Sequence, residues 1–215
     1  MSAGFFPIFK NTSREDYFPL DLSVENQLFT LSILEDPDRM QETIDHITDD
    51  LGKKVPYGGY FEKRKLYERS AHFGEKENRR NLHLGVDFWA SSGTEVLCPM
   101  EGIVHSFKNN INFGDYGPTI ILKHTSHSSK VFYSLYGHLS KESISSINIG
   151  DHFEKGEIIA ELGNSKENGN YAPHLHLQLI KDIGEYNGDY PGVCSENDRE
   201  LYQENCPNPL DFIGF

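Results

Sequence analysis

Cysteine is scarce in this sequence, which holds three in 215 residues, an odd number for a framework of disulfides. None of the three lies in a Cys-x-x-Cys pair. Cys98, in the segment EVLCPMEG, is expected to be a buried thiol, while Cys194 and Cys206 would pair only under oxidising conditions. The sequence therefore does not predict a disulfide-stabilised fold.

Long apolar runs are also missing. No stretch approaches the roughly 18 apolar residues of a transmembrane helix. The first residues, MSAGFFPIFKNTSREDYF, lack the basic region and the apolar region of a signal peptide. We therefore expect a cytoplasmic protein, or a periplasmic or extracellular one if a leader has been removed.

Basic residues are outnumbered, because 20 Lys and Arg face 33 Asp and Glu, for a net charge of −13. This balance argues against nonspecific binding to nucleic acid or to anionic membranes, since both need a basic surface. Acidity alone identifies no protein partner. The hydrophobic content of 37%, with 11 Tyr and 14 Phe, is that of a soluble globular chain.

Residues 1–70 lack the short β-type segments of the rest of the chain and are expected to form an N-terminal extension. Asp36 as N-cap, Pro37 in the first turn and Gly52 as the stop predict one helix between them. Met40, Ile44, Ile47 and Leu51 form its apolar stripe. The aromatic and basic segment VPYGGYFEKRKLYERS then predicts an arm that packs on the main domain.

Residues 71–181 are expected to form a β core. From about residue 82, short β-type segments such as GIVHSF, TIILKH, KVFYSLYGHL and EIIAEL alternate with turn signals rich in Gly, Asn and Pro. Such spacing without helices predicts an antiparallel β-sandwich or partly open barrel, mainly β, and α+β with the N-terminal helix. Residues 182–215 are expected to be an irregular, aromatic tail packed on this core.

Two histidines stand two residues apart in the apolar segment YAPHLHLQLI. In a strand, His174 and His176 share one face, roughly 6–7 Å apart at the backbone, so both can address one centre. The alternative is a pair of polar-face residues on a half-buried strand. The sequence predicts no particular role for Gln178 on the same face.

A second candidate pair is His83 and Asp87 in NLHLGVDFWASSGTEV. On a straight strand their backbones would be roughly 13 Å apart, too far to share one ion, so the segment must bend. Gly85 permits that bend, and His83 is then expected on a turn with Asp87 entering the following strand. A lone His-x-x-x-Asp is a weak signal by itself.

His138 ends an alternating strand in FYSLYGHLS, where its simplest role is a hydrogen bond to backbone. Together with His83, Asp87, His174 and His176, however, His138 favours a metal site over a purely structural role. One carboxylate and two imidazoles make a catalytic zinc set with an open position for water, and two further imidazoles remain to move protons. Charge and softness favour zinc, with cobalt or manganese as substitutes in vitro.

These segments, in order and spacing, resemble the lysostaphin/LytM-type zinc endopeptidases over about residues 79–180. The resemblance implies one zinc per chain, held by His83, Asp87 and His176, and a peptide or peptidoglycan fragment as substrate. It implies that His138 and His174 flank the nucleophilic water, without assigning the general base between them. Tyr136 beside them is expected to pack, and the other histidines to be structural or on the surface: His46, His72, His105, His124, His127 and His152.

Two features separate this chain from the usual family pattern. The small, Gly-rich lead-in to the His-x-His strand is replaced by NSKENGNYAPHLH, so Asn168–Tyr171 is expected to shape a different rim. Four segments are similar to a narrower branch, in which such a domain lies beside phosphotransferase-like and aminotransferase-like domains: DYGPTIILKH, YSLYGHLS, DYPGV and NCPNPL. That branch would favour an intracellular amide or small peptide over the cell wall.

Three functions follow as hypotheses: a zinc metallopeptidase acting on peptidoglycan or its fragments, an intracellular zinc hydrolase of a small amide, and a non-catalytic binding or regulatory module. Retention of all five polar positions counts against the third. Strands are expected on two sheets, with the site in an open groove, which suits an extended peptide. Because residues 1–70 lie outside the family resemblance, we hypothesise that the N-terminal helix docks over this groove and blocks it.

Overall fold

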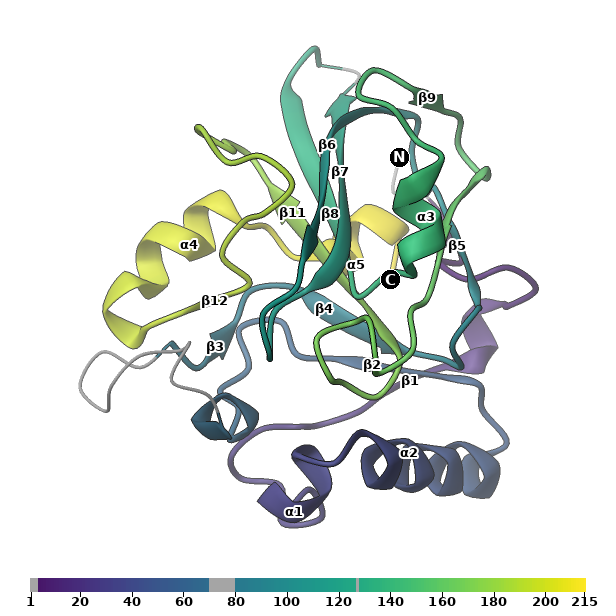
Figure 1. The fold of residues 1–215 in the computed structure, drawn as a ribbon, viewed down its shortest axis with the longest axis vertical. Coiled ribbons are helices and arrows are strands. Elements are labelled where there is room, and N and C mark those ends of the chain that lie inside the picture. The colour runs from purple at the N-terminus through teal and green to yellow at the C-terminus, as the bar shows by residue number, and fades with distance from the viewer. Residues whose placement is uncertain (1–3, 70–79, 127) are drawn as a thin grey trace.

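The computed structural model describes residues 4–69, 80–126 and 128–215. The predicted mainly-β architecture is confirmed, with one large mixed sheet and two small sheets in these ranges (Figure 1). The large sheet has the spatial order β1-β2-β4-β11-β8-β7-β6-β9 and is not closed into a barrel, because β1 and β9 lie at its two edges. The bounds of its strands are Tyr17–Pro19 (β1), Val55–Gly58 (β2), Val86–Trp89 (β4), Gly102–Asn110 (β6), Gly117–Thr125 (β7), Val131–Gly137 (β8), His152–Phe153 (β9) and His174–Ile180 (β11).

The pairing in the large sheet is antiparallel except at one end. β1 and β2 run parallel, and β2 then pairs antiparallel with β4. The N-terminal extension therefore adds two strands to the sheet that carries the candidate site. This is a closer association than an arm packed on a finished domain.

Two two-stranded sheets complete the β structure. β5 (Glu95–Leu97) pairs with β10 (Ile158–Glu161), and β3 (Leu82–His83) pairs with β12 (Val193–Cys194). The second pair joins the start of the β core to the C-terminal tail. It also fixes the backbone at His83, which lies opposite Val193.

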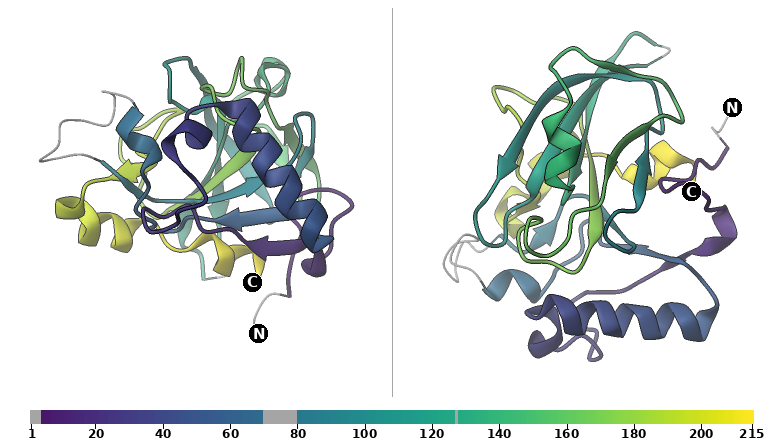
Figure 2. Two further views of the ribbon diagram at one scale, coloured as in Figure 1. Left: turned by 90° about the horizontal axis from the view of Figure 1, so that it is seen from below. Right: turned by 45° about the vertical axis from the view of Figure 1, so that its right-hand side comes forward.

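The predicted N-terminal helix is present as α2 (Pro37–Leu51), preceded by the single turn α1 (Leu31–Leu34). The Asp36 side chain accepts hydrogen bonds from the first-turn amides, and Gly52 ends the helix in the left-handed conformation, as expected from these residues. Figure 2 shows α1 and α2 lying across the end of the molecule that carries β1 and β2. Leu51, at the end of the apolar stripe, is exposed.

The C-terminal tail, expected to be irregular, contains two short helices besides β12. These are α4 (Arg199–Asn205) and α5 (Pro209–Ile213). The remaining short helices are α3 (Lys141–Ser145) and the 3-10 turns η1 (Arg14–Asp16), η2 (Leu66–Arg69) and η5 (Glu196–Asp198).

A separate apolar cluster holds the helices against the core. Leu34, Met40 and Ile44 pack with Trp89 of β4 and with Tyr171, just before β11. These contacts bring α1 and α2 to the ends of the two strands that carry the candidate site, because apolar surface on an amphipathic helix must be buried against a partner.

Cys98, Cys194 and Cys206 are all buried free thiols, and the expectation for Cys98 is confirmed. None of the helices within the described ranges is both long and apolar enough to cross a membrane.

Candidate metal centre

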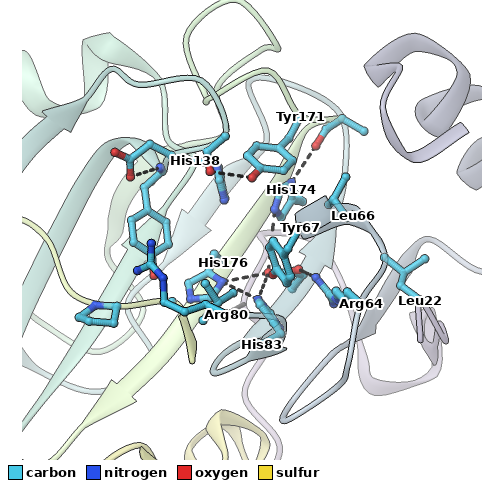
Figure 3. A pocket seen from close by; sticks show the side chains of 18 of the residues that line it. Leu22, Arg64, Leu66, Tyr67, Arg80, His83, His138, Tyr171, His174 and His176 are labelled. Carbon is cyan, nitrogen blue, oxygen red and sulfur yellow. Dashed lines mark hydrogen bonds and ion pairs between the residues drawn. The ribbon is translucent and has the colours of Figure 1, made fainter. Parts of the chain in front are cut away.

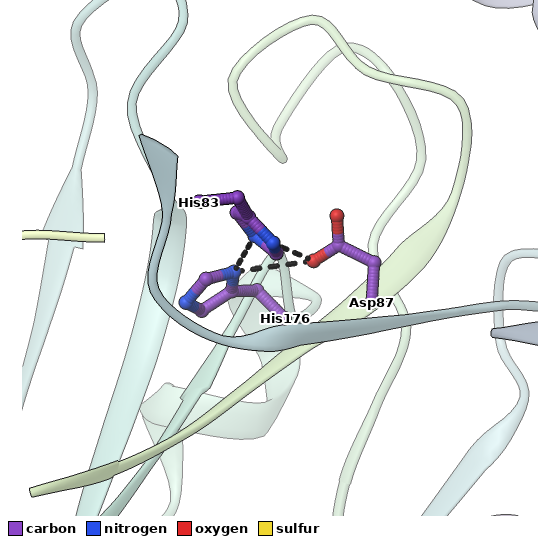
Figure 4. A group of neighbouring side chains, drawn as sticks. All are labelled: His83, Asp87 and His176. Atoms are coloured by element: carbon purple, nitrogen blue, oxygen red, sulfur yellow. Dashed lines mark hydrogen bonds and ion pairs between the residues drawn. The ribbon is translucent and has the colours of Figure 1, made fainter. Parts of the chain in front are cut away.

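Three of the five predicted site residues converge on one point. His83 Nε2 lies 2.8 Å from His176 Nδ1, and Asp87 Oδ1 lies 3.2 Å and 3.1 Å from these two nitrogens (Figure 4). All three residues are only 2% exposed. The sequence separates His176 from the other two by about ninety residues, so the fold has assembled this cluster.

The sheet explains how the cluster forms. β4 and β11 pair antiparallel with Asp87 directly opposite His176, which puts both side chains on the same face. Gly85 bends the chain between β3 and β4, and a Cβ there would lie 2.6 Å from the Leu177 carbonyl oxygen and 2.7 Å from the His176 ring. The predicted bend is confirmed, but His83 lies in the short strand β3 and not on a turn.

Hydrogen bonds on the far side of each imidazole fix its tautomer. His83 Nδ1 donates to the Gly59 carbonyl oxygen over 2.9 Å. His176 Nε2 lies 3.0 Å from Gln178 Oε1, and the Gln178 amide nitrogen donates to the Pro191 carbonyl oxygen over 3.1 Å. Because Pro191 offers only an acceptor, the amide must turn its oxygen toward His176, whose Nε2 therefore carries the proton.

The inner atoms of the cluster consequently present lone pairs to one another. With the outer nitrogen protonated, a neutral ring offers a lone pair at its inner nitrogen, which is Nε2 for His83 and Nδ1 for His176, and Asp87 Oδ1 adds a negative charge. Three lone-pair donors this close repel each other unless a cation lies among them. Two nitrogens and one oxygen, each with its outer partner, are the donor set of a protein metal site.

Electrostatics in the buried cluster favour the forms that bind a cation. Burial, together with the nearby Arg64 guanidinium, lowers the pKa of His83 to about 3, so this imidazole is neutral at pH 7. Burial opposes ionisation of Asp87, yet its neighbours His83 and Arg64 hold the pKa of that carboxyl well below its usual range. Neutral His83 and ionised Asp87 are the protonation states that a metal requires.

The two predicted acid–base residues lie beside this cluster. The His138 and His174 ring centroids are 4.2 Å apart, and His174 Nε2 lies 3.9 Å from Asp87 Oδ1. Nδ1 of each ring donates over 2.7 Å to a carbonyl oxygen, that of Asn168 for His138 and that of Ala172 for His174. In the neutral form of each ring, Nε2 is therefore the nitrogen that carries the lone pair.

Both of these imidazoles have lowered pKa values. Burial is the main cause, and for His138 the neighbouring His174 and His176 add to it. His138 also has φ of 63°, the left-handed conformation that a residue with a Cβ seldom adopts, and it immediately follows Gly137 at the end of β8. Strain of this kind is commonly found at functional sites.

Two residues of the lead-in to β11, Asn168 and Tyr171, contact His138. Asn168 is fully buried and its backbone holds His138, as described above. Tyr171 packs its ring edge-on against His138 with centroids 4.9 Å apart. On the other side, Trp89 stacks on His174 with centroids 5.8 Å apart.

Arg64 and Gln178 are site residues for which the sequence predicted no role. Arg64 Nη1 contacts Asp87 Oδ2 at 2.5 Å, with both side chains 3% exposed. Nothing in the segment YFEKRKLYERS distinguishes this arginine from its basic neighbours. For Gln178 the alternation His-x-His-x-Gln was a usable signal, because it places all three side chains on one strand face.

The five residues lie in a pocket of about 290 Å³, and three parts of the chain form its walls (Figure 3). The N-terminal extension supplies an apolar wall, the β core supplies the histidines, and the C-terminal tail closes another side. The expected open groove is therefore a walled pocket. Residues of the two outer walls include Leu22, Leu34, Met40, Leu66, Tyr67, Tyr186, Tyr190 and Pro191.

The remaining expectations concern packing. Tyr136 is fully buried in the main core, and its hydroxyl accepts from Ser134 over 3.1 Å. His124 is buried against Ser134 and the Glu101 carbonyl oxygen, so it is structural. His46 and His152 lie at the surface, while His72 and His127 fall outside the described residues.

Comparison with known proteins links this geometry to one family. The sequence model of peptidase family M23 matches residues 81–189, half of the chain. The match begins just before His83 and includes every one of the five site residues. It excludes Arg64 and the rest of the N-terminal extension.

Individual relatives are similar over a shorter stretch. An uncharacterized metalloprotease of Haemophilus influenzae is 36% identical over 97 residues, which cover 45% of this chain and 18% of the relative. The DD-carboxypeptidase/endopeptidase Mpg of Neisseria meningitidis is 31% identical over 97 residues, covering 45% and 20%. The chain thus spans about a fifth of the length of these curated relatives.

Among solved structures, the catalytic domain of the antimicrobial peptidase lysostaphin from Staphylococcus simulans matches with a TM-score of 0.38 and 24% identity. The match covers 57% of this chain and 80% of that domain.

Proposed function

Because the chain belongs to peptidase family M23, we propose that it is a zinc-dependent metallopeptidase that hydrolyses peptide bonds in peptidoglycan or in soluble muropeptides. The observation that carries the proposal is the convergence of His83, Asp87 and His176 with their lone pairs facing one point. The names of two relatives, a metalloprotease and a DD-carboxypeptidase/endopeptidase, support the reaction class.

Zinc is the metal that this donor set suits best. Two imidazoles and one carboxylate are the ligands of catalytic zinc sites, which leave the fourth position for water or substrate. When bound, the ion would act as a Lewis acid and lower the pKa of a water molecule toward about 7. The protein contributes the neutral imidazoles, the ionised Asp87 and a site shielded from bulk solvent.

His138 and His174 would move the protons. Each ring is fixed through Nδ1 to a backbone carbonyl, so its Nε2 is the atom that faces the reaction. We assign one neutral imidazole to accept a proton from the attacking water at Nε2 and to return it to the leaving amine. The other can donate a hydrogen bond from Nε2 to the developing oxyanion only as an imidazolium, because its Nδ1 proton is already given to a backbone carbonyl.

A second candidate is hydrolysis of a small amide or short peptide, and the shape of the pocket favours it. A volume of about 290 Å³ is at the lower end of the range for small-molecule sites, roughly 300–1,000 Å³. The walls contributed by Leu34 and Met40 on one side and Tyr190 on the other leave less room than an open groove for a polymeric cross-bridge.

One set of assays tests the proposal and separates the candidates. Untagged protein should carry about one zinc per chain by mass spectrometry, and the Asp87→Ala, His176→Ala double variant should carry none. The protein should release products from intact sacculi or from soluble muropeptides, and His174→Ala should abolish this while retaining zinc. His152→Ala, which changes an exposed histidine, is the matched control.

The substrates distinguish the outcomes. Cleavage of short peptides or amides with no attack on sacculi or muropeptides would select the second candidate. A zinc-loaded protein that cuts none of these substrates would contradict both and would point to a binding module. Absence of zinc even after it is offered would contradict the metal centre itself.

A further inference from the structure

Arg64 is a buried arginine that reaches the candidate metal centre from outside the family-matched region. It belongs to the N-terminal extension, and its side chain is only 3% exposed. A buried guanidinium is costly unless it is paired and hydrogen-bonded, so such a residue is placed by specific partners.

Besides Asp87, two partners hold the guanidinium, and a backbone hydrogen bond and the space at Gly59 help to place the residue. Its Nε donates to Glu62 Oε2 over 2.6 Å, and its carbon lies 6.0 Å from the centre of the Trp89 ring. The Arg64 backbone nitrogen donates to the Asn81 carbonyl oxygen over 3.0 Å, which ties the arm to the start of the core. Gly59 leaves room for it, because a Cβ there would lie 2.0 Å from Arg64 Nη2.

The two carboxylate oxygens of Asp87 consequently have different partners. Oδ1 faces the imidazoles of His83 and His176 at 3.2 Å and 3.1 Å. Oδ2 is engaged by Arg64 Nη1 in a charge-assisted hydrogen bond, which is among the stronger hydrogen bonds in proteins. This hydrogen bond opposes a rotation of the carboxylate that would present both oxygens to one ion.

We propose that Arg64 is a positioning residue that restricts Asp87 to one-oxygen metal binding. The inference rests on the proposed metal centre. A carboxylate free to bind through both oxygens would fill an additional position around the ion, and water or substrate would lose that position. Arg64 therefore keeps the coordination number low and the open position available.

A purely structural role is the alternative, in which Arg64 only neutralises the buried carboxylates of Glu62 and Asp87. Measurements of activity alone would not separate the two roles, because loss of positioning and loss of charge balance would both lower the activity. The coordination number of the bound metal does separate them. Cobalt reports it directly, since the intensity of its visible absorption falls as the coordination number rises.

The test uses the full chain loaded with cobalt at saturation. Arg64→Met removes the cation and keeps a long apolar side chain, and the Glu62→Gln, Arg64→Met double variant also keeps the net charge of the cluster. We expect both to bind cobalt and to show visible absorption per bound cobalt weaker by about twofold or more than the unmodified protein. Glu62→Gln alone, which leaves the contact between Arg64 and Asp87 in place, should keep the original spectrum.

The double variant provides the result if Arg64→Met fails to fold, because it leaves no unpaired charge at Glu62. Unchanged absorption per bound cobalt in a folded variant that lacks Arg64 would overturn the proposal and leave the charge-balancing role. If the unmodified protein binds no cobalt, the metal centre of the proposed function fails, and this inference fails with it. The two failures are therefore distinguishable.

Discussion

The carbonyl oxygen of Gly59 accepts a hydrogen bond from His83 Nδ1 over 2.9 Å. Gly59 follows β2 in the N-terminal extension, whereas His83 lies within the family-matched region. A backbone group from outside the family-matched region therefore sets the tautomer of a proposed metal ligand. Partners of this kind orient the ring and raise its basicity toward the metal.

Gly59→Ala should damage both stability and metal binding. Gly59 has φ of 105°, and the added Cβ would lie 2.7 Å from His83 Nδ1 as well as against Arg64. We expect a loss of about 2–5 kcal/mol in the free energy of unfolding and a drop of roughly tenfold or more in zinc affinity. Urea unfolding and competition with a chelator would measure the two effects.

Gly93→Ala is the matched control for this substitution. Gly93 also has a positive φ, 81°, but nothing lies within 4 Å of its would-be Cβ. It should cost about 1–2 kcal/mol and leave zinc affinity unchanged. Equal effects of the two substitutions on zinc affinity would contradict a specific role for the space at Gly59.

Gln178→Met should weaken zinc binding while keeping the side-chain volume. It removes the acceptor of His176 Nε2 and so frees the ring to adopt the other tautomer. We expect a fall of roughly 10–100-fold in zinc affinity, measured by chelator competition.

Ser134→Ala controls for the loss of a buried polar group. Ser134 is fully buried and bonded to His124, away from the ligands. Its removal should lower stability by about 1–3 kcal/mol and leave zinc affinity unchanged. A Gln178→Met protein with unaltered zinc affinity would show that the strand alone orients His176.

Removal of residues 1–70 distinguishes a blocking segment from a supporting one. If these residues only blocked the pocket, the shortened protein would be more active. We expect instead poor stability and loss of zinc, because β2 pairs with β4 and because Gly59 and Arg64 contact His83 and Asp87. Thermal unfolding and zinc content would be compared with those of the full chain, and a folded, zinc-binding, more active fragment would support the blocking hypothesis.

The zinc-free protein should lose stability as the pH falls below about 6.5. Burial lowers the pKa of His83, His124, His138 and His174 in the folded state, so unfolding takes up protons below the unfolded-state value. Stability from these groups is complete above pH 6.5 and declines toward each folded pKa, which for His83 is about 3. Each contributes up to about 1.4 kcal/mol per pH unit within its window.

Urea unfolding at pH 8, 7, 6 and 5 measures this slope. His124→Gln should reduce it by up to one proton, because His124 lies away from the proposed ligands. A stability that does not change between pH 7 and pH 5 would contradict the neutral, buried state of these rings.

The sequence was sufficient for features that depend on local pattern. Asp36, Pro37 and Gly52 define the ends of α2, because capping and proline geometry act within a few residues. The alternation around His174 and His176 predicted their shared face, and the spacing of His83 and Asp87 required the bend at Gly85. Resemblance to the family then identified which of these side chains belong together.

Contacts between residues far apart in the chain could not be predicted from the sequence in the same way. That β2 would join β4, and that Arg64 would meet Asp87, depends on the packing of the whole extension, for which the sequence has no periodic signal. The open groove was predicted from the β core alone. Leu34, Met40 and Tyr190 contribute to the walls. Their positions depend on how the apolar faces of the N-terminal extension and the C-terminal tail pack on the β core.

The position of β11 in the large sheet has a consequence for how the protein is made. β11 is the last of the eight strands to be synthesised, yet it lies between β4 and β8 near the middle of the sheet. Until residue 180 has left the ribosome, β4 and β8 each keep an unpaired edge, and such edges invite pairing with other chains. The proposed ligand His176 also arrives on this strand, so a metal could not be held by all three proposed ligands before β11 is made, and its capture would mark the moment at which the sheet is complete.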